Sequence, residues 1–125
     1  MKKTQSNPSE PLLVRCAQSF AGLKQDLSNV TYFCKGTVLK RMMKCGQKRC
    51  ACHHDSAKRH GPYFEWTYKE KGKTVNRRLR SEEVPFYQAA VQQHRKLLSV
   101  LKRMERLSRK AVVQLALNSL EKKNP

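Results

Sequence analysis

The stretch KCGQKRCACHHDSAKRHGPY, residues 44–63, decides the fold of this 125-residue chain. It places four metal-ligating side chains in the spacing Cys-x4-Cys-x-Cys-x7-His, namely Cys45, Cys50, Cys52 and His60. Three thiolates and one imidazole can complete the tetrahedral shell that Zn²⁺ takes in structural sites. Unligated cysteines are often buried in apolar cores, but this stretch is too polar to be core. The sequence therefore predicts a closed zinc site that staples an irregular loop, with no open position for hydrolytic chemistry.

The ligand set stays open at this point, because other donors lie within reach. His53 and His54 are closer in sequence to Cys52 than His60 is, and Cys34 is a further thiol. A cluster without metal is the remaining alternative. Five cysteines are an odd number, and three of them within eight residues do not suit a disulfide framework. This cysteine usage fits a reducing, cytoplasmic location better.

Alternating side chains after the loop predict a β-hairpin over residues 62–80. In its first arm Phe64, Trp66 and Tyr68 alternate with polar residues, which is the period of a strand with one apolar face. The turn is predicted at residues 70–73, because Gly72 can take a positive φ there. A sheet this small needs a staple or a helix behind it. We therefore expect the three aromatic side chains to be core residues.

Helices are predicted on both sides of a zinc-binding module at residues 31–80, which also contains a strand at residues 37–44. Residues 1–10 are polar and are predicted to be a flexible leader. Residues 11–30 carry an apolar helical stripe, formed by Leu13, Cys16, Ala17, Phe20, Leu23 and Leu27. Residues 81–123 carry a heptad seam typical of a coiled coil, formed by Ala90, His94, Leu97, Leu101, Met104, Ser108, Ala111 and Leu115.

The C-terminal helix is too long to be covered by the rest of the chain, since about 41 residues would run about 60 Å. Either it breaks near Ser108 and forms a helical hairpin that packs on the N-terminal helix, or it pairs with a second copy as a homodimer. The sequence thus predicts a single-domain α+β fold. A small zinc-stapled antiparallel sheet, made of a hairpin plus one strand, is flanked by an N-terminal helix and a long basic C-terminal helix.

The positive charge is large and unevenly distributed. The chain has 27 Lys and Arg residues against 9 Asp and Glu, a formal charge of +18. Residues 35–80 hold fourteen of these cations and three acids, and residues 94–110 hold seven cations and one acid. Such an excess is best tolerated beside a polyanion. We expect nucleic-acid contacts from Arg41, Lys48, Arg49, Lys58, Arg59, Tyr63, Lys71, Lys73, Arg77, Arg78, Arg80, Arg103 and Arg106.

Other classes of protein are disfavoured by what the sequence lacks. It has no run of about 18 apolar residues and no apolar N-terminal stretch, so we expect neither a membrane span nor secretion. It has no carboxylate pair, no Ser/His/Asp set whose spacing supports a catalytic triad, and no Gly-rich loop of the kind that binds phosphates. We therefore do not expect this protein to be an enzyme. His94 lies on the heptad seam and is expected to pack rather than to catalyse.

The blocks Lys44-Cys45-Gly46, Cys50-Ala51-Cys52 and 60–64 (HGPYF), followed by a Gly-Lys hairpin and a basic helix, resemble a known pattern. They are similar to a family of small bacterial proteins of unknown function with a CG-x3-C-x-C…HGPY signature, whose genes often lie beside transposases. The resemblance spans about residues 36–107. It implies metal ligation by the three cysteines and His60, a hairpin that starts at residues 61–63, and a mobile-element setting.

These observations favour a zinc-stabilised nucleic-acid-binding accessory protein of a mobile genetic element, which acts on DNA with a transposase or recombinase. Two alternatives remain. The first is an RNA-binding subunit of a ribonucleoprotein machine, in which the same cations follow an RNA backbone. The second is a helical adaptor that binds a partner enzyme without touching nucleic acid.

Overall fold

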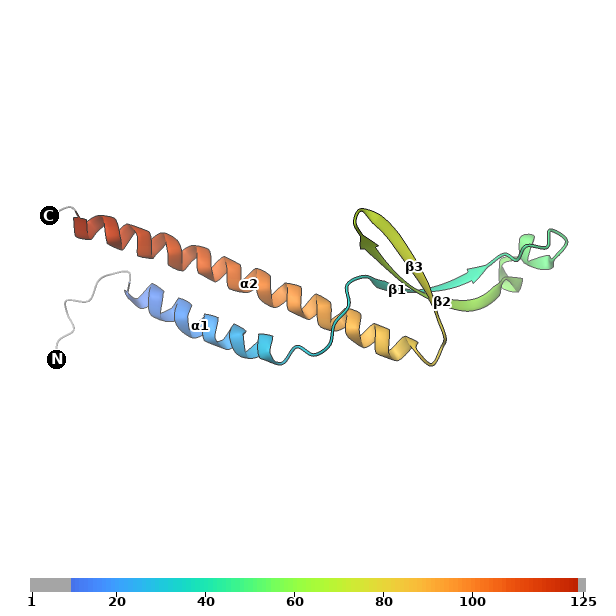
Figure 1. The fold of residues 1–125 in the computed structure, drawn as a ribbon, viewed down its shortest axis with the longest axis horizontal. Coiled ribbons are helices and arrows are strands. Elements are labelled where there is room, and N and C mark those ends of the chain that lie inside the picture. The colour runs from blue at the N-terminus through green and yellow to red at the C-terminus, as the bar shows by residue number, and fades with distance from the viewer. Residues whose placement is uncertain (1–9, 124–125) are drawn as a thin grey trace. The chain divides into compact units, whose positions relative to one another are not determined.

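The computed structural model describes residues 10–123 and contains two helices and a three-stranded sheet (Figure 1). The elements run in the order α1 (Glu10–Ser28), β1 (Thr37–Met43), β2 (His60–Glu70), β3 (Lys73–Leu79) and α2 (Val84–Lys123). Two short 3₁₀ helices, η1 (Ala51–His53) and η2 (Ser56–Lys58), lie between β1 and β2. The predicted α+β fold is confirmed. The predicted leader lies outside the described residues except for Glu10, which begins α1.

The sheet is antiparallel throughout and has the order β1-β2-β3. The hairpin turn consists of Lys71 and Gly72, whose φ angles of 52° and 79° are both positive, as a tight type I′ turn requires. Strand β2 begins two residues earlier than the sequence predicts, because His60 already pairs with Met43 of β1. The first residue of the central strand is thus one of the four candidate ligands.

The two faces of the sheet differ in character. On one face Trp66 pairs across the strands with Val38 and Arg77, and its ring lies 5.1 Å from that of Tyr87 in the first turns of α2. The opposite face is polar, and Thr67 there donates a hydrogen bond to Asn76 at 2.7 Å. One face therefore packs on a helix, and the other is left to solvent or to a partner.

The core of this region is smaller than the aromatic pattern predicts. Phe64, Trp66 and Tyr68 are only half-buried, so their expected place in the core is partly wrong. The buried side chains nearby are aliphatic, namely Leu79, Val84 and Val91. A single helix cannot cover the whole width of a three-stranded sheet, and large rings at its margins stay partly exposed.

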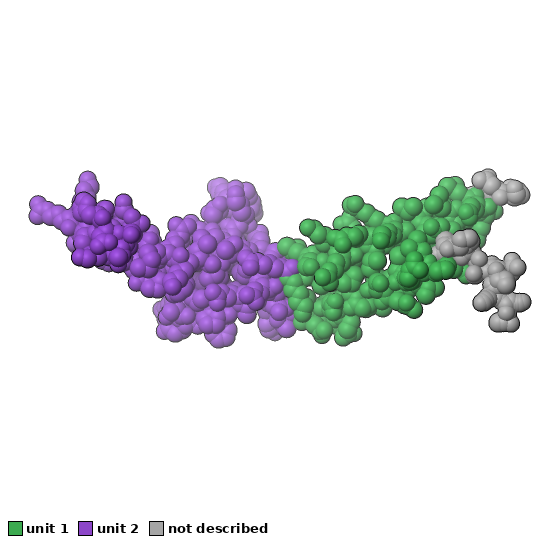
Figure 2. Space-filling model, turned by 180° about the vertical axis from the view of Figure 1, so that it is seen from behind, with its two compact units in different colours: residues 1–30, 96–125 green, residues 31–95 purple. Residues whose placement is uncertain are grey.

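The chain divides into two compact units, residues 31–95 and residues 1–30 with 96–125 (Figure 2). In the second of these units, α1 lies against the C-terminal part of α2 (Figure 1). An apolar groove there is lined by residues of the α1 stripe, by residues of the α2 seam and by Leu107, namely Leu13, Cys16, Ala17, Phe20, Leu107, Ser108, Ala111 and Leu115. The expected packing of the C-terminal helix on the N-terminal one is thus present.

The predicted break near Ser108 is absent, because α2 is continuous over its 40 residues. The Ser108 hydroxyl donates to the carbonyl oxygen of Met104 at 2.8 Å, which satisfies it inside the helix. Within residues 10–123, no helix combines the length and apolar character needed to cross a bilayer.

Candidate metal centre

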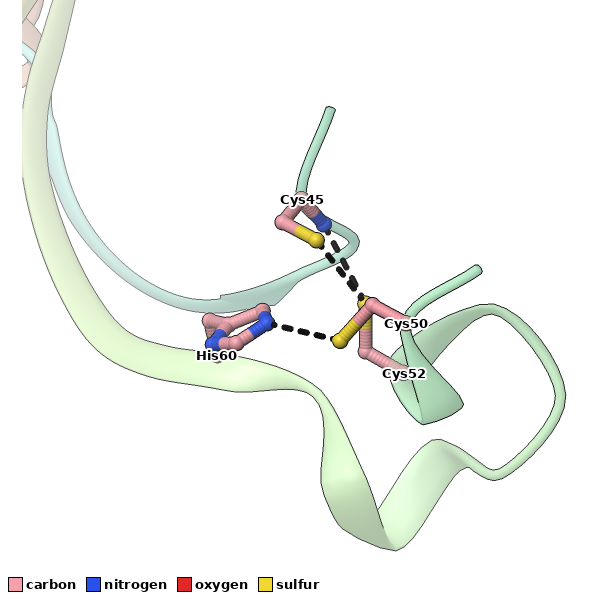
Figure 3. A group of neighbouring side chains, drawn as sticks. All are labelled: Cys45, Cys50, Cys52 and His60. Carbon is pink, nitrogen blue, oxygen red and sulfur yellow. Dashed lines mark hydrogen bonds between the residues drawn. The ribbon is translucent and has the colours of Figure 1, made fainter. Parts of the chain in front are cut away.

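The four predicted ligands meet where β1 and β2 leave the sheet (Figure 3). Cys45 follows β1, Cys50 and Cys52 lie at the start of η1, and His60 is the first residue of β2. One donor atom from each lies within 4.8 Å of the other three. They form the one group of three or more Cys, His, Asp or Glu side chains in the described part of the chain that could hold a metal ion.

The donor separations fit a tetrahedral ion. The Sγ atoms of Cys45 and Cys52 are 3.6 Å apart, and Cys50 Sγ lies 3.3 Å from His60 Nε2. A tetrahedron with metal–sulfur bonds of about 2.3 Å has edges of about 3.8 Å. The residues present therefore suit a four-coordinate ion, with all four positions taken by protein atoms.

Backbone and side-chain donors brace this arrangement. The Cys45 amide donates to Cys52 Sγ at 3.3 Å, an interaction that favours a thiolate. The His53 ring nitrogen Nε2 lies 2.8 Å from the carbonyl oxygen of Cys45. Because His53 is engaged in this way, it supports the loop around the first ligand. His53, His54 and Cys34 all lie outside the four-residue group, so the alternative ligand sets that include them are not needed.

The sulfurs differ in their electrostatic surroundings. Hydrogen bonds from the Cys52 backbone amide and from the His60 ring, together with those from the Cys52 and Cys45 thiols, lower the pKa of Cys50 to about 6. Burial raises the pKa of the Cys52 thiol, which is 0% exposed. A bound cation would favour the deprotonated form of every thiol in the group. Cys52 is thus the sulfur that most needs such a cation to become charged.

Cations from the sequence-predicted contact set surround this loop and the hairpin. Lys48 and Arg49 lie between the first two cysteines, and Lys58 lies in η2. Some side chains of the predicted contact set are exposed and form no hydrogen bond or ion pair with another described residue. They are Lys48, Arg49, Lys58, Lys71, Lys73, Arg80, Arg103 and Arg106. Arg103 and Arg106 belong to the helical unit rather than to the sheet. The predicted set is thus divided between the two units.

Arg41, Tyr63, Arg77 and Arg78 of the predicted set are engaged within the fold, and Arg59 is half-buried. Arg41 forms an ion pair with Glu65 at 2.9 Å, and the Arg78 guanidinium lies 4.4 Å from the centre of the Tyr63 ring. Both pairs lie on the polar face of the sheet. Arg59 is half-buried, and its Nε is buried without an acceptor among the described residues.

Arg77 lies on the opposite, packed face of the sheet. It donates a 2.6 Å hydrogen bond to the Tyr87 hydroxyl and forms a 3.5 Å ion pair with Glu83. Alternation along each strand, together with the turn predicted at residues 70–73, places Arg77 on the same face as Trp66, and this signal was available in the sequence. The sequence held no comparable signal for the supporting role of His53, which depends on a contact across the folded loop.

Comparison with known proteins identifies a family but no activity. Residues 13–93 match a family described as a domain of unknown function (DUF6788). No curated protein and no solved structure matches the chain. The match includes most of α1, the whole sheet, the four candidate ligands and the start of α2. The uncharacterised family expected from the sequence is therefore confirmed, and the chain belongs to the DUF6788 domain family.

Proposed function

We propose that this protein is a zinc-stabilised nucleic-acid-binding accessory protein that binds DNA as part of a mobile genetic element, beside a transposase or recombinase. The observation that carries the proposal is the density of unpaired cations around a braced loop. Residues 35–80 hold fourteen Lys and Arg residues against three acids, and Glu65, one of those acids, is already paired with Arg41. A surface of this kind attracts the phosphates of a nucleic acid.

Zinc is the metal proposed, on the chemistry of the donors. Soft thiolates with an imidazole in a tetrahedral group suit Zn²⁺, whereas Mg²⁺ and Ca²⁺ prefer oxygen ligands. The role is structural, because four protein ligands leave no position for a reacting water. We propose no chemical step for this chain.

The centre would act by fixing the positions of neighbouring cations. Lys48 and Arg49 lie within the four-residue span between Cys45 and Cys50, and Lys58 is two residues from His60. With both ends of such short spans ligated, the side chains lose less conformational freedom on meeting a phosphate. The loop can thus bind a phosphate backbone with a smaller entropic cost than a free basic segment.

The test is the salt dependence of binding to a labelled DNA duplex of about 20 base pairs. We expect the double variant Lys48→Gln, Arg49→Gln to reduce the slope of log affinity against log salt by about 1.8, which is about 0.9 for each lost phosphate contact. The matched control, Arg15→Gln with Lys24→Gln, removes the same charge from exposed positions of α1 and should leave the slope unchanged. Equal slopes in the wild type and the loop variant would remove the loop from the interface.

Two other results would favour the alternatives. Preference for structured RNA over the duplex at the same ionic strength would point to a ribonucleoprotein subunit. Absence of binding to either nucleic acid at low salt would leave the adaptor role. Recovery of a transposase or recombinase with the tagged protein, lost in the loop variant, would support the proposed mobile-element setting.

A further inference from the structure

We propose that the polar face of the sheet enters the major groove of duplex DNA and reads base edges there, with Arg78 and Asn76 as the base-contacting residues. The inference rests on the proposed DNA binding, to which it adds a surface and a mode of recognition. The strand register, the charges on this face and the contacts that hold its side chains carry the inference, and all of them lie within residues 31–95.

Strand register defines which side chains share this face. Thr67 of β2 lies opposite Thr37 of β1 and Asn76 of β3, and Glu65 lies opposite Arg78. Because successive side chains of a strand alternate between the two faces, these point away from the face that packs on α2. Thr37, Asn76 and Arg78 are exposed. The polar face therefore offers hydrogen-bonding side chains from all three strands to a partner.

The charge of this face suits a polyanion. Alternation places three cations on it, Arg41, Lys69 and Arg78, against one acid, Glu65. The Glu65 carboxylate is paired with Arg41 at 2.9 Å, and its side chain is only 18% exposed, against 49% for Arg41. The acid is thus largely covered and neutralised, and the face presents positive charge to the phosphates that border a groove.

The width of the sheet matches the major groove. Neighbouring strands lie about 4.8 Å apart, so three strands span about 10 Å, which is below the major-groove width of about 12 Å and above the minor-groove width of about 6 Å. Pairing of β1 with β2 ends at Thr37 and Thr67, and the preceding residue, Gly36, has a φ of +113°, outside the range of a strand. Beyond that pair the sheet narrows to β2 and β3, and a two-stranded ribbon is a form that the major groove admits.

Arg78 is held in a position from which it can bind a base. Its guanidinium lies over the Tyr63 ring, 4.4 Å from the ring centre. Among the described residues, the one acceptor of its side chain is Met43 Sδ, a weak acceptor 3.9 Å away. A stacked guanidinium keeps its edge free, and this edge carries the N–H pair that binds guanine O6 and N7. Stacking also reduces the conformational freedom that Arg78 loses on binding.

Asn76 is oriented by the neighbouring strand. Thr67 Oγ1 donates to Asn76 Oδ1 at 2.7 Å. The amide still presents its N–H donors and the second lone pair of Oδ1, which are the groups that bind adenine N7 and N6. Asn76 and Arg78 are two residues apart on β3, or about 6.8 Å, which equals two base-pair steps of about 3.4 Å. The two side chains can therefore reach different base pairs of one site.

Unpaired cations lie beyond both ends of this face. Lys48 and Arg49 belong to the loop between β1 and β2, and Lys71 and Lys73 lie at the hairpin turn, and all four are exposed. Phosphate contacts fix the position of a protein on a duplex, whereas base contacts specify the sequence. The loop and the turn would thus position the protein, and the polar face between them would read the bases.

The test begins with selection by the full chain from a pool of duplexes that carry about 20 random base pairs. We expect a recurrent sequence that contains guanine and that binds more tightly than a scrambled duplex. Arg78→Gln should reduce this ratio of affinities about 5- to 150-fold. The matched control is Arg77→Gln, which removes the same charge from the packed face of the same strand and should change the ratio less than twofold. Selection with Asn76→Ala should lose the preference at another base pair, and an unchanged preference would overturn the role of Asn76.

A second measurement changes the DNA instead of the protein. In the selected duplex, 7-deazaguanine removes the major-groove acceptor N7, and hypoxanthine removes the minor-groove amino group of the same guanine. We expect the wild type to bind the 7-deazaguanine duplex about 10-fold or more weakly, because a hydrogen bond to a charged group is lost. Hypoxanthine should change its affinity less than twofold, and Arg78→Gln should be insensitive to 7-deazaguanine.

Trp66 is the chain's one tryptophan and lies on the packed face, so its emission spectrum shows whether each variant keeps the fold. If Arg78→Gln loses that signal, binding of the wild type to the modified duplexes decides instead. Three results would overturn the base reading while the proposed DNA binding stands. They are binding without an enriched sequence, a loss in Arg78→Gln no greater than in Arg77→Gln, and a wild type no more sensitive to 7-deazaguanine than to hypoxanthine. Absence of wild-type binding to the duplex pool would overturn both.

Discussion

Two histidines near the cysteines show how differently similar residues can serve one site. His60 places its ring nitrogen 3.3 Å from Cys50 Sγ, whereas His53 turns its own nitrogen to a backbone oxygen. The first is a candidate ligand, and the second supports the loop that holds another ligand. The two roles can be separated by substitution.

We predict that His60→Asn loses the metal, while His53→Asn keeps it with reduced affinity. A metal site that loses one of four ligands has an open position and binds far more weakly, whereas loss of a supporting hydrogen bond typically costs 10- to 100-fold. Metal content after purification without added zinc is measured by mass spectrometry. Full metal content in His60→Asn together with no metal in His53→Asn would contradict the prediction and show that the two histidines have the opposite roles.

Thiol chemistry gives the site a defined response to pH. Because the pKa of Cys50 is lowered to about 6, protons compete with the metal for this thiolate mainly below about pH 6. We predict that the slope of log metal affinity against pH becomes about one unit steeper below that value. A colorimetric chelator titration from pH 8 to pH 5 measures it, and one straight line over the whole range would contradict the prediction.

At the residue scale the sequence predicts the Cys/His cluster better than the other contacts. Residue type and spacing favour Cys45, Cys50, Cys52 and His60 but leave Cys34, His53 and His54 open as ligands, and the folded loop brings only the first four together among the described residues. The engagement of Arg77 with Tyr87 and Glu83 depends on how a helix packs on the sheet, which local spacing does not specify.

Among the elements, the loop between β1 and β2 is the one that we expect to depend most on a bound metal. It contains two single-turn 3₁₀ helices, each three residues long, and few long-range backbone hydrogen bonds. The hairpin of β2 and β3, by contrast, is paired along its whole length from Phe64–Leu79 to Glu70–Lys73. Stability is thus unequal along the chain.

We predict that chelation frees residues 44–59 and leaves the hairpin folded. Without the ion, the loop is closed by hydrogen bonds to sulfur and by one imidazole contact, which are too weak to offset its conformational entropy. Hydrogen exchange followed by mass spectrometry should show protection lost in loop peptides and kept in peptides from residues 64–79. Loss of protection throughout the sheet would mean that the metal holds the entire unit together.

A glycine controls the other end of the sheet. We predict that Gly36→Ala destabilises the protein by about 1–3 kcal/mol or more, because residues other than glycine are strained at this positive φ and the new Cβ would meet the Thr67 carbonyl oxygen. Urea unfolding followed by Trp66 emission measures the change. Gly46→Ala is the control, since no atom lies within 4 Å of a Cβ there, and equal effects of the two substitutions would contradict the prediction.

The type of an element was predictable wherever the apolar residues keep one regular spacing along the whole segment. Alternation in residues 64–69 indicates a strand, and three- and four-residue steps indicate both helices. The exact ends were less predictable, because His60 enters β2 through its pairing with Met43, and pairing partners do not appear in a local pattern. The break expected near Ser108 was wrong for a related reason, since a hydrogen bond within the helix satisfies the serine hydroxyl.

For the whole molecule, the helical unit leaves apolar side chains uncovered. Val113, Leu117 and Leu120 follow helical spacing on α2 and are about half exposed or more. The seam residues Ser108 and Ala111 instead line the groove shared with α1, as does Leu115, which is itself 55% exposed. The homodimer that the sequence predicts through this helix would therefore use the uncovered residues.

We predict that the protein self-associates and that Leu117→Gln with Leu120→Gln shifts it to monomer, because burial of such side chains is the main driving force available to a chain this highly charged. Sedimentation equilibrium at several salt concentrations measures the change, with circular dichroism to show that helix content is kept. A wild type that stays monomeric at about 100 µM would contradict the prediction.

The central strand β2 has 11 residues. The loop with the candidate metal centre lies at its first residue and the hairpin turn lies just beyond its last. Strand β2 therefore separates the loop from the turn by at most about 37 Å. That length is close to one turn of B-DNA, about 34–36 Å. On the proposed function, the length of β2 would therefore set the interval between two points of contact with DNA. Removing two residues would shorten the interval by about 7 Å without exchanging the faces of the sheet.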